Sequence, residues 1–214
     1  PDDPDVYRYI RGTITVPRYV DSEHPPARLV YGDDGLPAYQ GDHEVEFHAV
    51  IPRSLAEPGA GPGRVLQYGH GFFLGRFQIW DPYPAYLAQD LEMVMFSTDW
   101  AGMSQRDIAA AAEILTDVSH FPAVPDRLHQ GITNVLALTR TATGVCTEQE
   151  AFEVDGQLSY DPDEVYFLGI SLGCILGSTA MSLSQDIERP VLHVGAAVFP
   201  FMQSRSVDFD EFEM

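Results

Sequence analysis

The sequence contains no lysine. All twelve basic residues of the 214-residue chain are arginine, and they face 32 acidic residues, so the formal net charge is −20. Without a lysine amine the chain cannot itself form a Schiff base or a Walker-type phosphate loop. A nucleic-acid partner is not expected either, because binding phosphates requires a positively charged surface. The acidity itself is typical of a protein kept soluble by charge or adapted to salt.

Cysteine is nearly as scarce, with only Cys146 and Cys174 present. Two cysteines do not make a disulfide scaffold, and neither stands with histidines at a spacing typical of zinc ligands. Cys146 follows one predicted helix and Cys174 begins the next, at opposite ends of the predicted sheet, so we expect no bridge. No pattern in the sequence requires a metal or an organic cofactor.

Long apolar runs are absent as well. No segment reaches the roughly 18 apolar residues that a membrane-spanning helix needs, so an integral membrane protein is not expected. No signal peptide is visible, and the sequence starts at Pro1 rather than methionine, which would fit the removal of an upstream segment. The last residues, 211–214, stop abruptly, so both ends look cut.

The hydropathy pattern predicts two kinds of strand. Residues 7–17 and 43–51 alternate apolar and polar side chains, which favours an antiparallel edge with one solvated face. Later strands are continuously apolar, as in strands buried on both faces: 65–68, 93–97, 164–168 and 191–199. Helices are predicted beside them, at 82–91, 105–117, 125–141 and from the residues after 173 to about 183. Residues 21–42 and 143–163 are predicted loops. Strands alternating with helices predict an α/β fold, a mostly parallel sheet with helices on both faces.

One motif carries chemistry. Gly169-Ile170-Ser171-Leu172-Gly173 fits G-x-S-x-G and lies between an apolar strand and a helix of small residues. This context is typical of a nucleophile elbow, in which a tight turn lifts the serine above the sheet at the positive end of the helix. Glycine is needed at 169 and 173 because side chains there would clash with the neighbouring strand and helix. We therefore predict Ser171 as a nucleophile; the alternative is a serine in an ordinary strand-to-helix turn.

A second motif, Gly69-His70-Gly71-Phe72-Phe73, directly follows an apolar strand. With the elbow, it resembles the α/β-hydrolase superfamily, in which lipases and esterases carry His-Gly after the third strand. The resemblance implies an oxyanion hole made by the backbone N–H groups of Phe72 and Leu172, with Phe73 as a less favoured donor. It implies that His70 and Gly71 position this loop.

The resemblance extends from about residue 64 to residue 200. Residues 96–104 and 126–131 are similar to segments of a group of bacterial lipase-like hydrolases. The resemblance implies the α/β-hydrolase fold, incomplete at its C-terminal end. Residues 1–63 would be the N-terminal strands and loops, and residues 64–214 the core, of a single domain. Together with the acidic composition, it favours a secreted or periplasmic protein.

The sequence departs from this family after the serine. The superfamily needs an acid and then a histidine in chain order, but the only histidine after Ser171 is His193, inside a predicted strand, where we expect a core or sheet residue. His120 and His129 precede the serine. The acid candidates are Asp208 and Asp210, although an acidic tail is more often simply solvated.

The missing partners imply further polypeptide. A serine without a base is a poor nucleophile, and an exposed apolar edge strand at 191–199 would favour aggregation. We expect that a second chain, or a continuation of this one, covers the strand and supplies the catalytic histidine and acid.

The sequence thus predicts a serine hydrolase that cleaves small-molecule or lipid carboxylic esters through an acyl-enzyme. Some aromatic residues could line an acyl pocket or could simply pack in the core: Tyr68, Phe72, Phe73, Trp80 and Trp100. Two alternatives remain open. One is a non-catalytic binding protein with a hydrolase fold, and the other is a different acyl-transfer enzyme, such as a peptidase or an acyltransferase.

Overall fold

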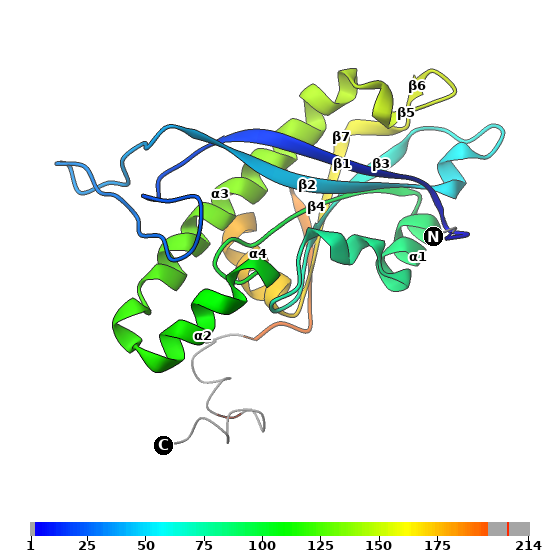
Figure 1. Cartoon of the computed structure of the whole chain (residues 1–214). Coiled ribbons are helices and arrows are strands. Elements are labelled where there is room, and N and C mark those ends of the chain that lie inside the picture. Colours follow the sequence, from blue (N-terminus) through cyan, green and yellow to red (C-terminus); the bar gives the residue numbers. More distant parts are fainter. Residues whose placement is uncertain (1–2, 197–204, 206–214) are drawn as a thin grey trace.

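Six strands form one mixed sheet in the computed structural model, which describes residues 3–196 and residue 205 (Figure 1). The strand order across the sheet is β1-β2-β4-β3-β7-β8. The strands span β1 Val6–Pro17, β2 Asp42–Pro52, β3 Gly63–Gly69, β4 Met93–Thr98, β7 Tyr160–Ile170 and β8 Arg189–His193. The helices are α1 Pro82–Leu91, α2 Ile108–Thr116, α3 Ala123–Thr143 and α4 Leu172–Leu183.

The two N-terminal strands make the antiparallel edge that the alternating sequence predicted. β1 pairs antiparallel with β2, from Val6 opposite Pro52 to Pro17 opposite Asp42. β2 then pairs antiparallel with β4. The remaining pairs, β4 with β3, β3 with β7 and β7 with β8, are all parallel.

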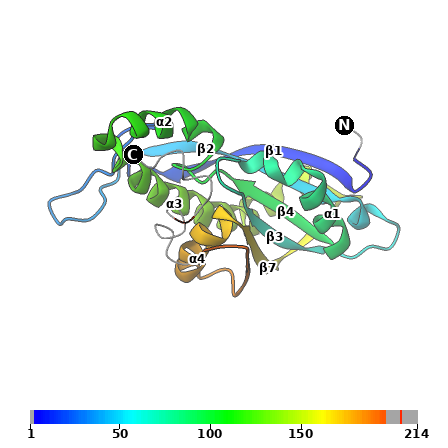
Figure 2. The same cartoon turned by 90° about the horizontal axis from the view of Figure 1, so that it is seen from below.

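Helices cover both faces of the sheet, as predicted (Figures 1 and 2). On β3, Leu66 and Tyr68 pack in a buried cluster with Ala85 and Ala88 of α1. Val65 faces the other way, into a cluster that includes Leu138 of α3. Side chains therefore alternate between two apolar layers, as the two-residue period of a strand requires. In the described part of the chain, no helix is apolar and long enough to span a bilayer.

A buried amide joins the centre of the sheet to α3. Gln67, on β3, donates from Nε2 to the carbonyl oxygen of Val135 at 2.8 Å, and its Oε1 accepts from the Thr139 hydroxyl. Gln67 is 2% exposed. Because burying an unsatisfied amide costs free energy, these bonds fix how α3 lies across β3.

The structure departs from the predicted elements in three places. The predicted helix at 105–117 starts with a 3-10 turn over Gln105–Asp107, and α2 begins at Ile108. The predicted loop at 143–163 contains 3-10 turns, the hairpin strands β5 Glu153–Val154 and β6 Gln157–Leu158, and the start of β7. Its polar composition concealed Phe152 and Tyr160, which are buried in the core beside Phe96.

The third departure is β8, which is shorter than the predicted strand at 191–199. It ends at His193, and the next residue, Val194, has a φ of 47°, which breaks the extended conformation. Residues 197–199 lie outside the described part of the chain.

His48 is a buried, neutral histidine on β2. Its ring stacks on Trp80, with 3.9 Å between ring centroids and 5° between planes, and Arg11 lies over the same indole. Burial and the nearby arginines, Arg76 and Arg11, lower the pKa of His48 from 6.5 to about 4. The unfolded chain would therefore bind a proton that folded His48 does not, and this difference destabilises the fold as the pH falls from 6.5 towards 4.

We expect His48→Phe, which keeps a stacking ring and removes the titration, to lower the pH dependence of the free energy of unfolding. Urea denaturation at pH 7 and pH 5 measures the difference for the parent chain and the variant. The variant should lose less stability on acidification than the parent chain. His24→Phe, at an exposed loop position, is the matched control, and an identical loss in parent and His48→Phe chains would contradict the assignment.

Candidate active site

Ser171 lies in a sharp turn between β7, which ends at Ile170, and α4, which begins at Leu172. Its φ is 56° and its ψ is −116°, a conformation that costs a non-glycine residue on the order of 1–3 kcal/mol. The residue is exposed, and it occupies the N-cap position of α4, at the end of the helix where the dipole is positive. The turn therefore presents Ser171 to solvent at the end of the sheet where the parallel strands finish.

Three glycines allow this turn, because two backbone segments meet without space for a side chain. A Cβ atom added to Gly173 would lie 2.0 Å from the carbonyl oxygen of Gly69 at the end of β3. A Cβ atom added to Gly169 would lie 2.2 Å from the carbonyl oxygen of Gly173. Real Cβ atoms do not come this close to backbone, so the first turn of α4 packs on the end of β3 through glycine alone.

The predicted oxyanion donors belong to these two adjoining segments. β3 and β7 pair up to Gly69 opposite Gly169, so the loop that starts at His70 begins beside the elbow. The Phe73 N–H donates to the carbonyl oxygen of Met103 at 3.2 Å. Within the described part of the chain, the Phe72 N–H has no acceptor. Leu172 is the first residue of α4, where helix N–H groups lack intrahelical partners.

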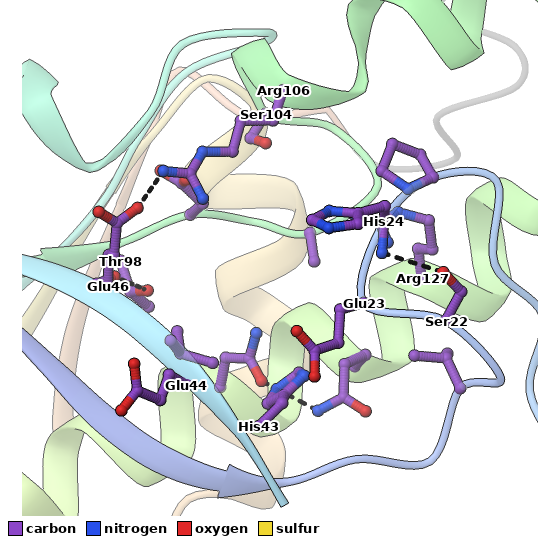
Figure 3. Close-up of a pocket in the computed structure, with 17 residues that line it drawn as sticks. Ser22, Glu23, His24, His43, Glu44, Glu46, Thr98, Ser104, Arg106 and Arg127 are labelled. Carbon is purple, nitrogen blue, oxygen red and sulfur yellow. Dashed lines mark hydrogen bonds and ion pairs between the residues drawn. The ribbon is translucent and has the colours of Figure 1, made fainter. Parts of the chain in front are cut away.

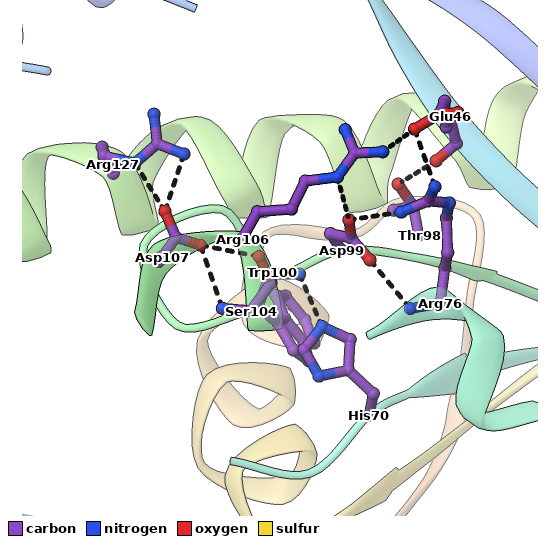
Figure 4. Close-up of polar contacts among 10 residues, drawn as sticks. All are labelled: Glu46, His70, Arg76, Thr98, Asp99, Trp100, Ser104, Arg106, Asp107 and Arg127. Carbon is purple, nitrogen blue, oxygen red and sulfur yellow. Dashed lines mark hydrogen bonds and ion pairs between the residues drawn. The ribbon is translucent and has the colours of Figure 1, made fainter. Parts of the chain in front are cut away.

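His70 is held in one tautomer. It is 0% exposed, and its Nε2 accepts a hydrogen bond of 2.8 Å from the Trp100 N–H (Figure 4). Nδ1 must then carry the proton, and it donates to the carbonyl oxygen of Gly71 at 2.8 Å. Burial lowers the pKa of His70, which keeps the ring neutral. With both nitrogens engaged in the loop, His70 cannot serve Ser171 as a base.

A chain of charged residues next to this loop was not predicted from the sequence. Asp99, directly after β4, accepts the Arg76 N–H at 2.8 Å and the Arg76 guanidinium at 2.6 Å. Arg76 also contacts Glu46 of β2, which pairs in turn with Arg106 (Figure 4). A usable signal was present, because an aspartate that directly follows an apolar parallel strand lies at the same edge as the ends of β3 and β7.

Solved structures with this arrangement identify the fold. A thermostable esterase from Pseudomonas putida ECU1011 matches 99% of this chain and 50% of its own, with a TM-score of 0.53 and 14% identity. An arylesterase matches 92% of this chain and 47% of its own, with a TM-score of 0.51 and 17% identity. The chain has the α/β-hydrolase fold. No protein-family model matches the sequence, and no curated protein does.

This likeness establishes the α/β-hydrolase fold and not the reaction, because the identities are low. The chain spans about half the length of the two matched structures.

Among the described residues, no side chain of the remaining triad candidates hydrogen-bonds to Ser171. His193 was predicted to be a core or sheet residue; it belongs to the sheet, but it is exposed because β8 is an edge strand. Its backbone carbonyl accepts the Ser171 N–H at 3.1 Å. His120 and His129 are exposed. The polar contacts of their rings are to neighbours in the chain, to Asp117 for His120 and to the Pro125 carbonyl oxygen for His129. Asp208 and Asp210 lie outside the described residues.

The aromatic residues divide into two groups. Tyr68 and Trp100 are 2% and 0% exposed, and both pack in core clusters. One face of the Trp80 ring stacks on His48. Phe72 is 47% exposed and its ring lies 4.3 Å from that of Phe73, so these two remain candidates to contact a substrate.

One cavity lies away from the elbow. It has a volume of about 500 Å³, and it is bordered by the loop around His24, the start of β2, the end of β4 and α3 (Figure 3). Its lining is mixed and includes the side chains of Glu23, His43 and Arg127, and Ser171 is not part of it. In the described part of the chain, no group of three or more His, Cys, Asp or Glu side chains could hold a metal ion.

The contact between Gly69 and Gly173 predicts a severe effect of one methyl group. We expect Gly173→Ala to destabilise the fold, because the backbone must move to admit the Cβ atom. Overpacking typically lowers the free energy of unfolding by about 1–3 kcal/mol, and the loss here should reach or exceed the upper end of that range. Chemical denaturation measures the loss. Gly61→Ala is the control, since a Cβ there meets nothing within 4 Å. Equal stability of the two variants would mean that the strand and helix do not approach as described.

Proposed function

We propose that this chain carries the nucleophile and the oxyanion hole of a serine hydrolase that cleaves carboxylic esters. The observation that carries the proposal is the strained, exposed backbone of Ser171 between β7 and α4. Strained residues persist where the surrounding structure holds them, and they cluster at functional sites. Esters are favoured because the matched structures are described as an esterase and an arylesterase.

The proposed reaction has two stages. Ser171 Oγ attacks the acyl carbon of the ester, and the Phe72 and Leu172 N–H groups stabilise the negative charge that develops on the carbonyl oxygen. The alcohol leaves, and an acyl group remains on Ser171. Water then attacks this acyl-enzyme and releases the acid, which restores the serine hydroxyl.

The general base is proposed to come from polypeptide outside these residues. Both nitrogens of His70 are engaged in the loop. The edge of β8 away from β7 has no partner strand among the described residues, and Val191 and Leu192 are 59% and 41% exposed there. A further segment that paired with this edge would bury apolar surface and could place a histidine and an acid above Ser171.

A second candidate is a binding protein with a hydrolase fold. It is favoured by one observation: within the described part of the chain, no hydrogen bond joins Ser171 Oγ to a histidine. A serine without a base has a pKa too high for attack at neutral pH.

Labelling with a fluorophosphonate, together with hydrolysis of p-nitrophenyl acetate and butyrate, tests these candidates. The intact preparation is used, and every polypeptide in it is identified by mass spectrometry. We expect Ser171→Ala to abolish labelling and to lower kcat/KM by at least about 10³-fold, because the nucleophile is removed.

Ser178→Ala, an exposed serine on the same helix, is the matched control and should behave as the parent chain does. Labelling or hydrolysis that survives in Ser171→Ala would contradict the assignment of the nucleophile. An inert parent protein that includes all of its polypeptide would favour the binding protein.

A further inference from the structure

The loop after β3 has its backbone donors almost fully engaged. The Gly71 N–H donates to Oε1 of Gln78 at 2.9 Å. The Phe73 N–H donates to Met103, and the Leu74 N–H donates to the carbonyl oxygen of Gly71 at 3.2 Å. Among these successive amides, only that of Phe72 has no acceptor in the described part of the chain. The loop is therefore held on both sides of the one donor that would face a substrate.

The direction of the Phe72 N–H follows from the peptide plane to which it belongs. That plane also contains the Gly71 carbonyl, which accepts from His70 Nδ1 and from the Leu74 N–H. In a trans peptide the N–H points away from the carbonyl. Two donors that fix the carbonyl of Gly71 thus also fix the direction in which the Phe72 N–H points.

The preceding peptide plane depends on Gln78. This plane contains the His70 carbonyl and the Gly71 N–H, and within the described chain that N–H donates to Oε1 of Gln78. The His70 carbonyl on the opposite side faces the elbow, where it would lie 3.0 Å from a Cβ atom on Gly173. The Gln78 bond therefore controls how the loop rests on the first turn of α4, which carries the second donor, Leu172.

Gly71 makes an external support necessary. Without a Cβ atom, a glycine rotates about φ and ψ more freely than any other residue, so neighbouring contacts must fix both of its peptide planes. Gln78 is itself fixed in the 3-10 turn Arg76–Trp80, where its N–H donates to the Gly75 carbonyl at 2.9 Å and its carbonyl accepts from the Asp81 N–H at 3.0 Å. Its side chain is part-buried, which shields the bond to Gly71 from water.

We propose that Gln78 is a positioning residue for the oxyanion hole. By holding the Gly71 N–H, it sets the spacing between the Phe72 and Leu172 donors, and it does not touch the substrate itself. The inference rests on the proposed function, because it concerns the same site.

The test compares Gln78→Leu, which removes the acceptor at similar size, with Gln78→Glu, which keeps an acceptor oxygen. Losing one oxyanion donor costs about 10²–10³ in kcat, so a misaligned donor should lower kcat for p-nitrophenyl butyrate by about 10-fold or more. KM should stay within about two-fold, because an interaction made only in the transition state is weakened. The rate of fluorophosphonate labelling of Ser171 should fall in parallel.

A second readout does not depend on turnover. Hydrogen exchange measured by NMR should show that the Gly71 amide loses protection in Gln78→Leu and keeps it in Gln78→Glu. Gln78→Glu should also recover most of the kcat for p-nitrophenyl butyrate. Gln89→Leu is the matched control, since Gln89 Oε1 accepts the Ser54 N–H at 2.8 Å in the same way but far from the loop. If Gln78→Leu does not fold, Gln78→Met removes the acceptor with an unbranched chain.

The outcomes separate the two proposals. If the parent protein and Gln78→Leu are labelled at Ser171 at the same rate and protect the Gly71 amide equally, the role of Gln78 is overturned. The proposed hydrolase function would not be affected by that result. A parent protein that is never labelled at Ser171 would overturn the proposed function and the positioning role with it. Loss of rate and protection in Gln78→Leu, recovered in Gln78→Glu, would support the inference.

Discussion

The contact between the end of β3 and the first turn of α4 is the constraint on which the rest of this site depends. Gly69 and Gly173 meet through backbone atoms alone, and any side chain at 173 would collide with the Gly69 carbonyl. The parallel pairing of β3 with β7 ends at this level, so the strand ends, the elbow and the loop after β3 converge there. The strained φ of Ser171 follows, because the chain must turn from strand to helix within one residue.

Polar contacts then fix the conformation of the loop after β3, which its glycines leave free to rotate. His70 is neutral and buried, and it joins the Trp100 amide after β4 to the Gly71 carbonyl after β3. Asp99 joins the same two segments through the backbone and the guanidinium of Arg76. Because these groups are mostly sheltered from water, losing one partner would leave an unsatisfied polar group and cost about 1–3 kcal/mol. The geometry of the loop is thus coupled to the packing of the carboxyl ends of β3 and β4. A rearrangement of the loop would break these hydrogen bonds and would therefore cost free energy.

Much of this fold could be predicted from the sequence, since its signals are local. Alternation in 7–17 and continuous apolar character in 93–97 report burial directly, and the glycines around Ser171 report a turn with no space for side chains. Contacts between distant segments left weaker signals. The side chain of Gln78 meets Gly71, and Asp99 meets Arg76, only because the ends of β3 and β4 adjoin. Tyr160 was not predicted to be buried because it lies in a polar segment and packs against Phe96 from another strand.

The same distinction explains why the sequence predicts a nucleophile and an oxyanion hole but no base. The proposed oxyanion donors are backbone N–H groups, and the backbone of a tight turn positions the proposed nucleophile, so glycine spacing predicts both within a few residues. A base is a side chain delivered by a separate loop, and its distance from the serine depends on packing that no short pattern encodes. Holding Ser171 at a φ of 56° costs free energy that an ordinary turn with glycine at that position would avoid. A serine at this position, where glycine would avoid that cost, supports the proposal that its hydroxyl has a function.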